Sequence, residues 1–204
     1  MSISRIKSFY SKYRTQKDLI EKLYLAAIVD TYDRVKNISG IKDFSENQIR
    51  DQFVLDFENS NLLLRPLVNN KTLYFSNENR VLTTTSVSRT DIEFIISWRG
   101  KFVVECKKLA SSEYRYIDDG LIRFTNLSYS ATEKFAGMVA FVVVKNCKKI
   151  SNKLKSKVEE FEFHKPSKSL LSELCSGWPY SFQSKHLRKG NKEIHIYHLF
   201  FEFI

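Results

Sequence analysis

Two stretches near the middle of the chain alternate between apolar and polar residues. The even positions are apolar from residue 91 to residue 97, and the same alternation returns from 101 to 107. A period of two residues is typical of strands that bury one face. The segment Trp98-Arg99-Gly100 fits a three-residue hairpin loop, whose last position is left-handed and therefore favours glycine. The pattern predicts a β-hairpin in which Ser97 faces Lys101 across the loop.

The same register places four ionisable residues on one face of the hairpin, because Glu93 would face Glu105 and Asp91 would face Lys107. Charged residues that alternate with apolar ones also occur on ordinary solvated sheet faces, and that interpretation stays open. The facing pair of Glu93 and Glu105 favours a functional site over a solvated face, since two opposed carboxylates destabilise a sheet unless a cation or a proton lies between them. The strands are also apolar enough to be central in a sheet, where a partly buried carboxylate needs a partner.

An acidic residue on one strand, followed by acid-x-lysine on the next, resembles the motif of the PD-(D/E)xK phosphodiesterase superfamily, which has the restriction-endonuclease-like fold. Asp91 and Glu105-Cys106-Lys107 match that motif, and Thr90 stands where the family often has proline. The resemblance covers about residues 45–145. It implies an α/β fold with an αβββαβ core, in which helices flank a mixed central sheet. An N-terminal helix and a C-terminal helix and strand would be additions to this core.

The chemistry expected of the motif follows from its ligand types. Asp91 and Glu105 supply carboxylate oxygens, which suit Mg2+ or Mn2+, and the resemblance implies that the carbonyl of Cys106 is a further ligand. Such a metal lowers the pKa of a bound water and shields charge in the transition state. We expect Lys107 to stay protonated beside the carboxylates, to orient the attacking water and to stabilise developing negative charge. The side chains of Asp91, Glu105 and Lys107 should converge in an open pocket.

A helix ahead of the hairpin carries another candidate. Ser45 and Gln48 are predicted to form a capping box at its start. Its buried stripe is predicted to consist of Ile49, Phe53 and Phe57. The superfamily often has a glutamate on such a helix, so we include Glu46 among the candidate catalytic residues. Complementing the positive end of the helix dipole is an equally good interpretation of Glu46.

The rest of the chain completes the expected domain. After the hairpin the sequence predicts helical segments at about residues 111–124 and 131–137, and then a buried strand at 138–144, where the chain is apolar without interruption. No glycine-rich or serine-rich linker divides the 204 residues. We therefore expect a single domain of residues 1–204, with its core at about 45–145 and a basic C-terminal extension at 146–204.

The basic residues outnumber the acidic ones and are unevenly spread. The net charge is +10, and twelve basic residues stand against four acidic ones between 145 and 192. Such a segment is suited to nucleic-acid phosphates, although the solvated side of a helix at 147–162 explains the lysines equally well. The candidate phosphate contacts are Arg123, Lys148, Lys149, Lys153, Arg188 and Lys189. For Arg123, a structural salt bridge is the alternative.

Three further features of the sequence concern the expected cellular location of the protein. The three cysteines lack CxxC spacing and support neither a disulfide framework nor a zinc site, which fits a reducing cytoplasm. We expect no membrane partner, because no apolar span is long enough for a membrane helix. The basic first seventeen residues fit a basic arm or an ordinary first helix better than an organellar transit segment.

The sequence thus predicts a divalent-metal-dependent nuclease that hydrolyses phosphodiester bonds in DNA. The resemblance further implies a 5′-phosphate product and an endonuclease of restriction, antiphage defence or repair. Two alternatives stay open: a non-catalytic nucleic-acid-binding module with the same fold, and a ribonuclease, since nothing in the pattern reads a 2′-hydroxyl. No helix-turn-helix or zinc-finger pattern is present to read a DNA sequence. A homodimer or a targeting partner protein would therefore direct the enzyme to its substrate.

Overall fold

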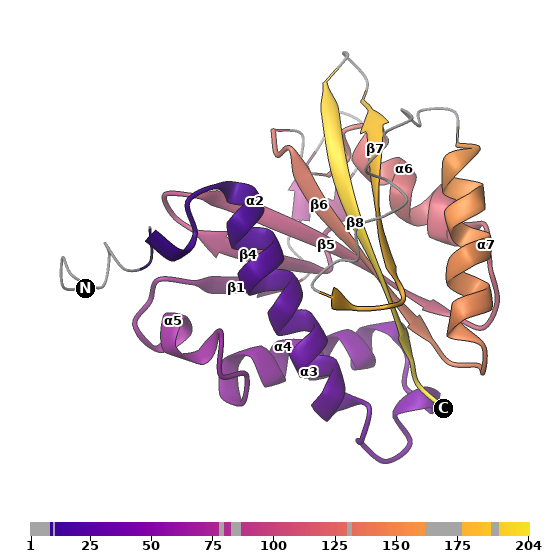
Figure 1. The fold of residues 1–204 in the computed structure, drawn as a ribbon, viewed down its shortest axis with the longest axis horizontal. Coiled ribbons are helices and arrows are strands. Elements are labelled where there is room, and N and C mark those ends of the chain that lie inside the picture. Colours follow the sequence, from indigo (N-terminus) through magenta and orange to yellow (C-terminus); the bar gives the residue numbers. More distant parts are fainter. Residues whose placement is uncertain are drawn as a thin grey trace.

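A mixed sheet of six strands lies at the centre of the fold, as Figure 1 shows for the computed structural model of the chain. The structure describes residues 9, 11–77, 80–82, 87–129, 132–161, 177–188 and 192–204. From one edge to the other, the strands of the sheet are β1 (Tyr74–Asn77), β4 (Ile92–Ile96), β5 (Gly100–Leu109), β6 (Phe135–Val142), β8 (Glu193–Glu202) and β7 (Ser181–Leu187). The neighbours β5, β6 and β8 run parallel, and the other pairs are antiparallel.

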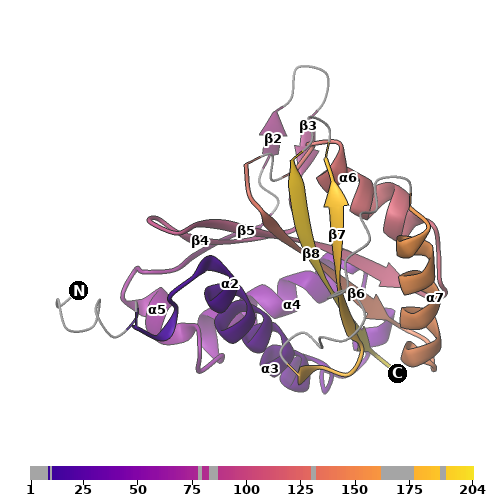
Figure 2. The same ribbon diagram turned by 45° about the horizontal axis from the view of Figure 1, so that its top comes forward.

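Helices cover both faces of this sheet (Figures 1 and 2). One face carries the continuous run of α2 (Gln16–Leu19), η1 (Ile20–Leu25) and α3 (Ala26–Val35), followed by η2 (Ile41–Asp43), α4 (Glu46–Asn59) and α5 (Arg65–Asn69). The other face carries η3 (Tyr116–Leu121), α6 (Ile122–Thr125) and α7 (Cys147–Glu159). The protein is therefore an α/β structure with an open mixed sheet between helices. Within the part of the chain described, no helix is long and apolar enough to cross a membrane.

The alternation along β5 decides what each sheet face contains. Phe102, Val104 and Cys106 enter the core beneath α3 and α4. Val103 and Leu109 enter the opposite core, which η3, α6 and α7 cover. Because successive side chains of a strand point to opposite faces, the odd-numbered Glu105 and Lys107 of β5 lie on the side of η3 and α6.

Helix α4 begins as the sequence predicts. The Ser45 hydroxyl accepts a hydrogen bond from the Gln48 backbone N–H at 3.3 Å, and the Gln48 side chain accepts one from the Ser45 N–H at 2.8 Å. This reciprocal capping box satisfies two N–H groups that a helix start leaves unpaired. The predicted apolar stripe is also confirmed, because Ile49, Phe53 and Phe57 are all buried.

The predicted hairpin exists, but its register was wrong by two residues. Ile96 pairs with Gly100, and Glu93 pairs with Val103 rather than with Glu105. The predicted pairs of Ser97 with Lys101 and of Asp91 with Lys107 are wrong for the same reason. The left-handed glycine is confirmed, since Gly100 has φ +77°, but it opens β5 instead of ending the loop. A shift of two residues leaves every side chain on its face, so the acids and Lys107 still share one side of the sheet.

The segment after the hairpin differs in part from the prediction. Helical structure is confirmed at η3 and α6, which occupy residues 116–125 where 111–124 was predicted. The helix expected at 131–137 is wrong over its described part, because Phe135–Val142 form β6 and pair in parallel with β5. Tertiary pairing with a neighbouring strand has outweighed the local preference there. Along the chain, the strands β1, β4 and β5 of the central sheet follow α4, with α5 before β1 and the short strands β2 (Arg80–Leu82) and β3 (Val87–Arg89) before β4. The segment η3–α6 and then β6 come next.

Candidate functional site

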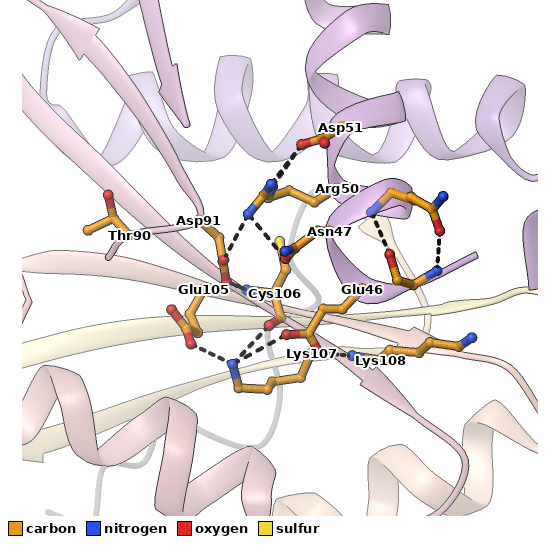
Figure 3. A network of polar contacts seen from close by, with 12 residues as sticks. Glu46, Asn47, Arg50, Asp51, Thr90, Asp91, Glu105, Cys106, Lys107 and Lys108 are labelled. Atoms are coloured by element: carbon orange, nitrogen blue, oxygen red, sulfur yellow. Dashed lines mark hydrogen bonds and ion pairs between the residues drawn. The ribbon is translucent and has the colours of Figure 1, made fainter. Parts of the chain in front are cut away.

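The candidate site lies where the sheet opens beside β5. Pairing between β4 and β5 ends at Ile92 and Val104, so the second half of β5 continues with β6 alone at its side. Asp91 stands immediately before β4 at this opening, and its Oδ2 accepts a hydrogen bond of 2.7 Å from the backbone N–H of Cys106 (Figure 3). The Asp91 carboxylate therefore takes the place of a neighbouring strand and is held against the acid-x-lysine segment.

Lys107 connects the acidic residues of the site. Its Nζ donates a hydrogen bond of 2.5 Å to Oε1 of Glu105 and one of 3.1 Å to the carbonyl oxygen of Cys106. The same Nζ lies 3.7 Å from Oε1 of Glu46, which comes from the start of α4 (Figure 3). Residues from β5 and from a helix on the other sheet face therefore meet at one ammonium group.

A second cation reaches Glu105 from α6. Arg123 donates through Nη1 to Glu105 Oε1 at 2.9 Å and to the Tyr129 hydroxyl at 2.7 Å. Both cations thus bind the same oxygen of Glu105. The other oxygen, Oε2, is buried and has no hydrogen-bond partner among the described residues. A buried carboxylate oxygen without a partner is costly, and a bound cation would satisfy it.

Asp91 has a cationic neighbour of its own on α4. The guanidinium of Arg50 lies 3.4 Å from Asp91 Oδ1 and donates at 2.8 Å to Asp51. Arg50 is almost fully buried, and it also donates to the Asn47 side chain at 3.3 Å (Figure 3). Because a buried arginine needs carboxylates around it, this contact fixes Asp91 from the side of the helix.

Glu46 lies at the edge of the site rather than at its centre. Its Oε2 accepts hydrogen bonds from the Lys108 backbone N–H at 2.6 Å and from Arg115 Nη2 at 2.9 Å. These contacts attach the start of α4 to β5. The carboxylate therefore has a structural role that is visible, while Oε1 still faces Lys107.

Burial and charge shift the protonation of these groups. Burial, with Asp91 as the next cause, raises the pKa of Glu105 to about 8, in spite of Lys107 and Arg123. Burial also raises the pKa of Asp91, against the lowering effect of the Cys106 N–H. For Lys107, burial lowers the pKa, but the carboxylates of Glu105, Glu46 and Asp91 outweigh it and raise the pKa above the ordinary value. Lys107 is therefore protonated at neutral pH.

The expected pocket is more closed than the sequence suggested. Glu105 is completely buried, and only 8 % of the Lys107 side chain is exposed. Asp91 is 15 % exposed and Arg123 is 38 % exposed, so solvent reaches the site along these two side chains. The hydrogen bonds of Lys107 and Arg123 to Glu105 Oε1 cover the carboxyl group on this side.

The donor set of the site bears on a divalent metal. Among the residues described, no group of three or more histidine, cysteine, aspartate or glutamate side chains is arranged to hold an ion. The available oxygens are the Asp91 carboxylate, Glu105 Oε2 and the carbonyl of Cys106. Mg2+ commonly takes only one or two carboxylates from a protein and completes its octahedron with water and substrate phosphate. The unpartnered Oε2 of Glu105 and the all-oxygen donor set fit such an ion.

The candidate phosphate contacts are found in different environments. Lys148, Lys149 and Lys153 are exposed on α7. Arg188 is buried, and its guanidinium donates to the carbonyl of Glu133, so it has a local structural partner. Lys189 lies outside the described residues. Of the candidates that the structure describes, only Arg123 touches the group of acids around Lys107.

Several residues of the site escaped the sequence argument. Arg50 and Arg115 lie in segments that were predicted as helices, and Tyr129 lies between two predicted segments. Arg50 stands next to the buried Ile49, and that adjacency was the available signal. Gly120 was missed as well: a Cβ there would lie 2.5 Å from Met138 Cε and 3.7 Å from Lys107 Cε. Glycine lets η3, a π-helix of the kind often found at functional sites, approach the site closely.

Comparison with family models, with curated proteins and with solved structures gives no match to this chain.

Proposed function

We propose that this protein is a divalent-metal-dependent nuclease that hydrolyses phosphodiester bonds in DNA. The observation that carries the proposal is the convergence of Asp91, Glu105 and Lys107 on one face of the sheet, with one buried oxygen of Glu105 lacking a partner. Carboxylates beside a protonated lysine at the open side of a strand are suited to binding a metal and a phosphate.

The arrangement of elements supports a restriction-endonuclease-like core. Apart from the insertions α5, β2 and β3, the chain runs through helix α4, three strands of the central sheet, the helical segment η3–α6 and the parallel strand β6, which is the order of that αβββαβ core. In this core, Asp91 precedes β4, and Glu105 and Lys107 lie on β5. This order of the motif residues along the elements supports the proposal.

Each residue has a chemical role in this proposal. Asp91, Glu105 and the Cys106 carbonyl would hold Mg2+ or Mn2+, which supplies an activated water and shields negative charge when bound. Lys107 is protonated and places its charge beside the carboxylates, where it orients the water and stabilises the developing negative charge. Lys107 is a poor general base, because its neighbours hold the proton on it.

Arg123 is the best-placed residue for the substrate phosphate. The hydrogen bonds described for its guanidinium all use Nη1, and more than a third of the side chain is exposed. The remaining N–H donors can therefore bind a phosphate oxygen while Nη1 stays attached to Glu105 and Tyr129. A guanidinium that is already anchored loses less conformational entropy when it binds.

The test is cleavage of linear and circular DNA by purified wild-type protein and by Asp91→Asn, Glu105→Gln and Lys107→Ala, with Mg2+, Mn2+ or EDTA. We expect cleavage with either metal, none with EDTA, and a loss on the order of a hundredfold or more in each variant. Asp119→Asn, which removes an exposed acid of η3 beside the site, is the matched control and should stay active. Circular dichroism verifies the fold, and Mn2+ binding followed by electron paramagnetic resonance should weaken in Asp91→Asn.

Full activity of a variant purified free of contaminating nuclease would refute the assignment of the site. Metal-dependent cleavage of RNA with intact DNA would replace the proposal by a ribonuclease. Salt-sensitive DNA binding that is unchanged by EDTA, without cleavage of either polymer, would identify a binding module instead.

A further inference from the structure

An exposed tyrosine lies between α7 and the segment that leads into η3. Tyr114 stands two residues before η3 and is 65 % exposed. Lys157 of α7 places its Nζ 3.8 Å from the centroid of the Tyr114 ring, and the same Nζ donates a hydrogen bond to the carbonyl of Ser112. The segment η3–α6 lies beside α7 in both views of the ribbon (Figures 1 and 2). Tyr114 is therefore attached to α7 through the end of one lysine.

The contacts of Tyr114 leave part of its ring accessible. Lys157 covers one face, and among the residues that the structure describes no other ring packs against Tyr114. The Tyr114 carbonyl accepts hydrogen bonds from the backbone N–H groups of Ile117 and Asp118, at 2.7 Å and 2.8 Å, which hold the backbone at this point. Tyrosine loses little conformational entropy when it binds, since it has few rotatable bonds. The open face of the ring is thus a preformed surface for a planar group.

The surroundings of Tyr114 on α7 are basic. Lys149, Lys153 and Lys157 follow one another at intervals of four residues and share one side of the helix. Lys149 and Lys153 are exposed, and the row ends at the Tyr114 ring. A row of lysines that leads to an exposed aromatic ring has both components of a surface for single-stranded nucleic acid, which are charge for the phosphates and a ring for a base.

On its other side, Tyr114 adjoins the candidate site through its neighbour in sequence. Arg115 donates through Nη2 to Glu46 Oε2 at 2.9 Å, and Lys107 Nζ lies 3.7 Å from the other oxygen of the same carboxylate. Arg115 also donates to the carbonyl of Lys108 on β5 at 3.2 Å. Tyr114 therefore stands between the row of lysines on α7 and the group of acids around Lys107.

We propose that Tyr114 is a stacking platform for an unpaired base of a DNA strand whose phosphates lie along the α7 lysines. The inference rests on the proposed nuclease function and names the substrate class as DNA with a single-stranded segment at the site. Every base has a π-face, so the platform accepts any base. A base inside a duplex is stacked on its neighbours and reaches the ring only after a costly unstacking.

The contact of Lys157 with Tyr114 also has a purely structural interpretation, in which it fastens the segment before η3 to α7. A cation over a tyrosine ring stabilises such a contact whether or not a base is bound. The two roles differ in one respect, since only the stacking role depends on the bases of the ligand.

The test measures binding by the full chain, in EDTA, through the anisotropy of three fluorescent ligands: single-stranded DNA, an abasic strand of the same length and charge, and a fully paired duplex. The variants are Tyr114→Leu, which removes the aromatic ring, and Tyr114→Phe, which keeps it. Tyr74→Leu is the matched control, because Tyr74 is 47 % exposed on β1, the edge strand opposite β7. Thermal unfolding verifies that each variant folds.

We expect Tyr114→Leu to bind the single strand at least about fivefold more weakly than the wild type. Its affinity for the abasic strand and for the duplex should stay within about twofold, because neither ligand presents an unpaired base. Tyr114→Phe and Tyr74→Leu should bind all three ligands like the wild type. With Mg2+, Tyr114→Leu should raise the KM for cleavage of the single strand and leave kcat within about twofold, as expected for a loss of binding alone.

An equal loss on the intact and the abasic strand would show that Tyr114 only holds the segment before η3, and it would overturn the inference. Unchanged affinity of Tyr114→Leu for all three ligands would overturn it as well, and cleavage by the wild type would still support the nuclease. A wild-type protein that cleaves no DNA with any metal, but whose Tyr114→Leu variant loses affinity only for the intact strand, would remove the nuclease proposal and keep the platform.

Discussion

At Glu105, burial and charge are in conflict. It is fully buried beside Asp91, and its pKa of about 8 lies well above the ordinary 4.5. The folded protein therefore holds a proton that the unfolded chain has already released between these two pH values. Folding stability from this group is present at low pH and is lost as the pH rises from about 4.5 to about 8.

This loss of stability with rising pH gives a prediction for the metal-free protein. In EDTA, the free energy of unfolding of the wild type, relative to that of Glu105→Gln, should fall between pH 5 and pH 8 by up to about 1.4 kcal/mol per pH unit. Urea unfolding at several pH values measures both proteins. The difference between them cancels contributions from other groups, such as His195, whose pKa is lowered by burial. Parallel pH profiles of the two proteins would show that Glu105 is already charged in the folded state.

The residues of the site also show what a sequence can reveal about chemistry. The convergence of Asp91, Glu105 and Lys107 followed from a period of two, because that period fixes the face of each side chain. The contacts of Arg50 and Arg123 did not follow, since they join elements that are distant in sequence and depend on how helices pack on the sheet. The burial of the site was not predictable from the sequence either, because it results from the hydrogen bonds of Lys107 and Arg123 to Glu105.

Elements were predictable where a local signal was strong. The capping box of Ser45 and Gln48 identified the start of α4, and Gly100 identified the turn of the hairpin. The register was not predictable, because Gly100 can serve either as the last loop position or as the first residue of β5. The strand at Phe135–Gly137 was missed because its parallel partner, β5, lies some thirty residues away in the sequence.

Gly137 allows β6 to pack beneath the aromatic core, and this gives a prediction at the level of the strand. A Cβ at Gly137 would lie 3.0 Å from Phe102 Cζ and 3.1 Å from Val104 Cγ2, both on buried side chains of β5. Gly137→Ala should therefore destabilise the protein by about 1–3 kcal/mol through overpacking, measured by urea unfolding.

A second substitution separates overpacking from a general effect on the strand. Phe102→Leu removes the ring atoms that the new methyl group would meet, so Gly137→Ala should cost less in the Phe102→Leu background than in the wild type. An equal cost in both backgrounds would show that contact with Phe102 is not the cause.

At the scale of the whole molecule, the excess positive charge lies outside the candidate site. The chain carries a net charge of +10, while the site itself balances carboxylates against lysine and arginine. The lysines Lys148, Lys149 and Lys153 are exposed on α7, which covers the same sheet face as η3 and α6. In the proposed nuclease, such an arrangement would attract DNA over a wide surface and leave the reaction to the few groups of the site.

The last prediction follows from this separation. Lys148→Ala/Lys149→Ala/Lys153→Ala should weaken binding to every DNA sequence, with a salt dependence of log affinity that is shallower by up to about three. The cleavage rate at saturating protein should stay unchanged, because none of these lysines touches the site. The matched control Lys22→Ala/Lys36→Ala/Lys42→Ala removes the same charge from the elements covering the other sheet face. If both triple variants lose equal affinity, net charge alone attracts the DNA, and if neither loses any, the α7 lysines form only a solvated helix surface.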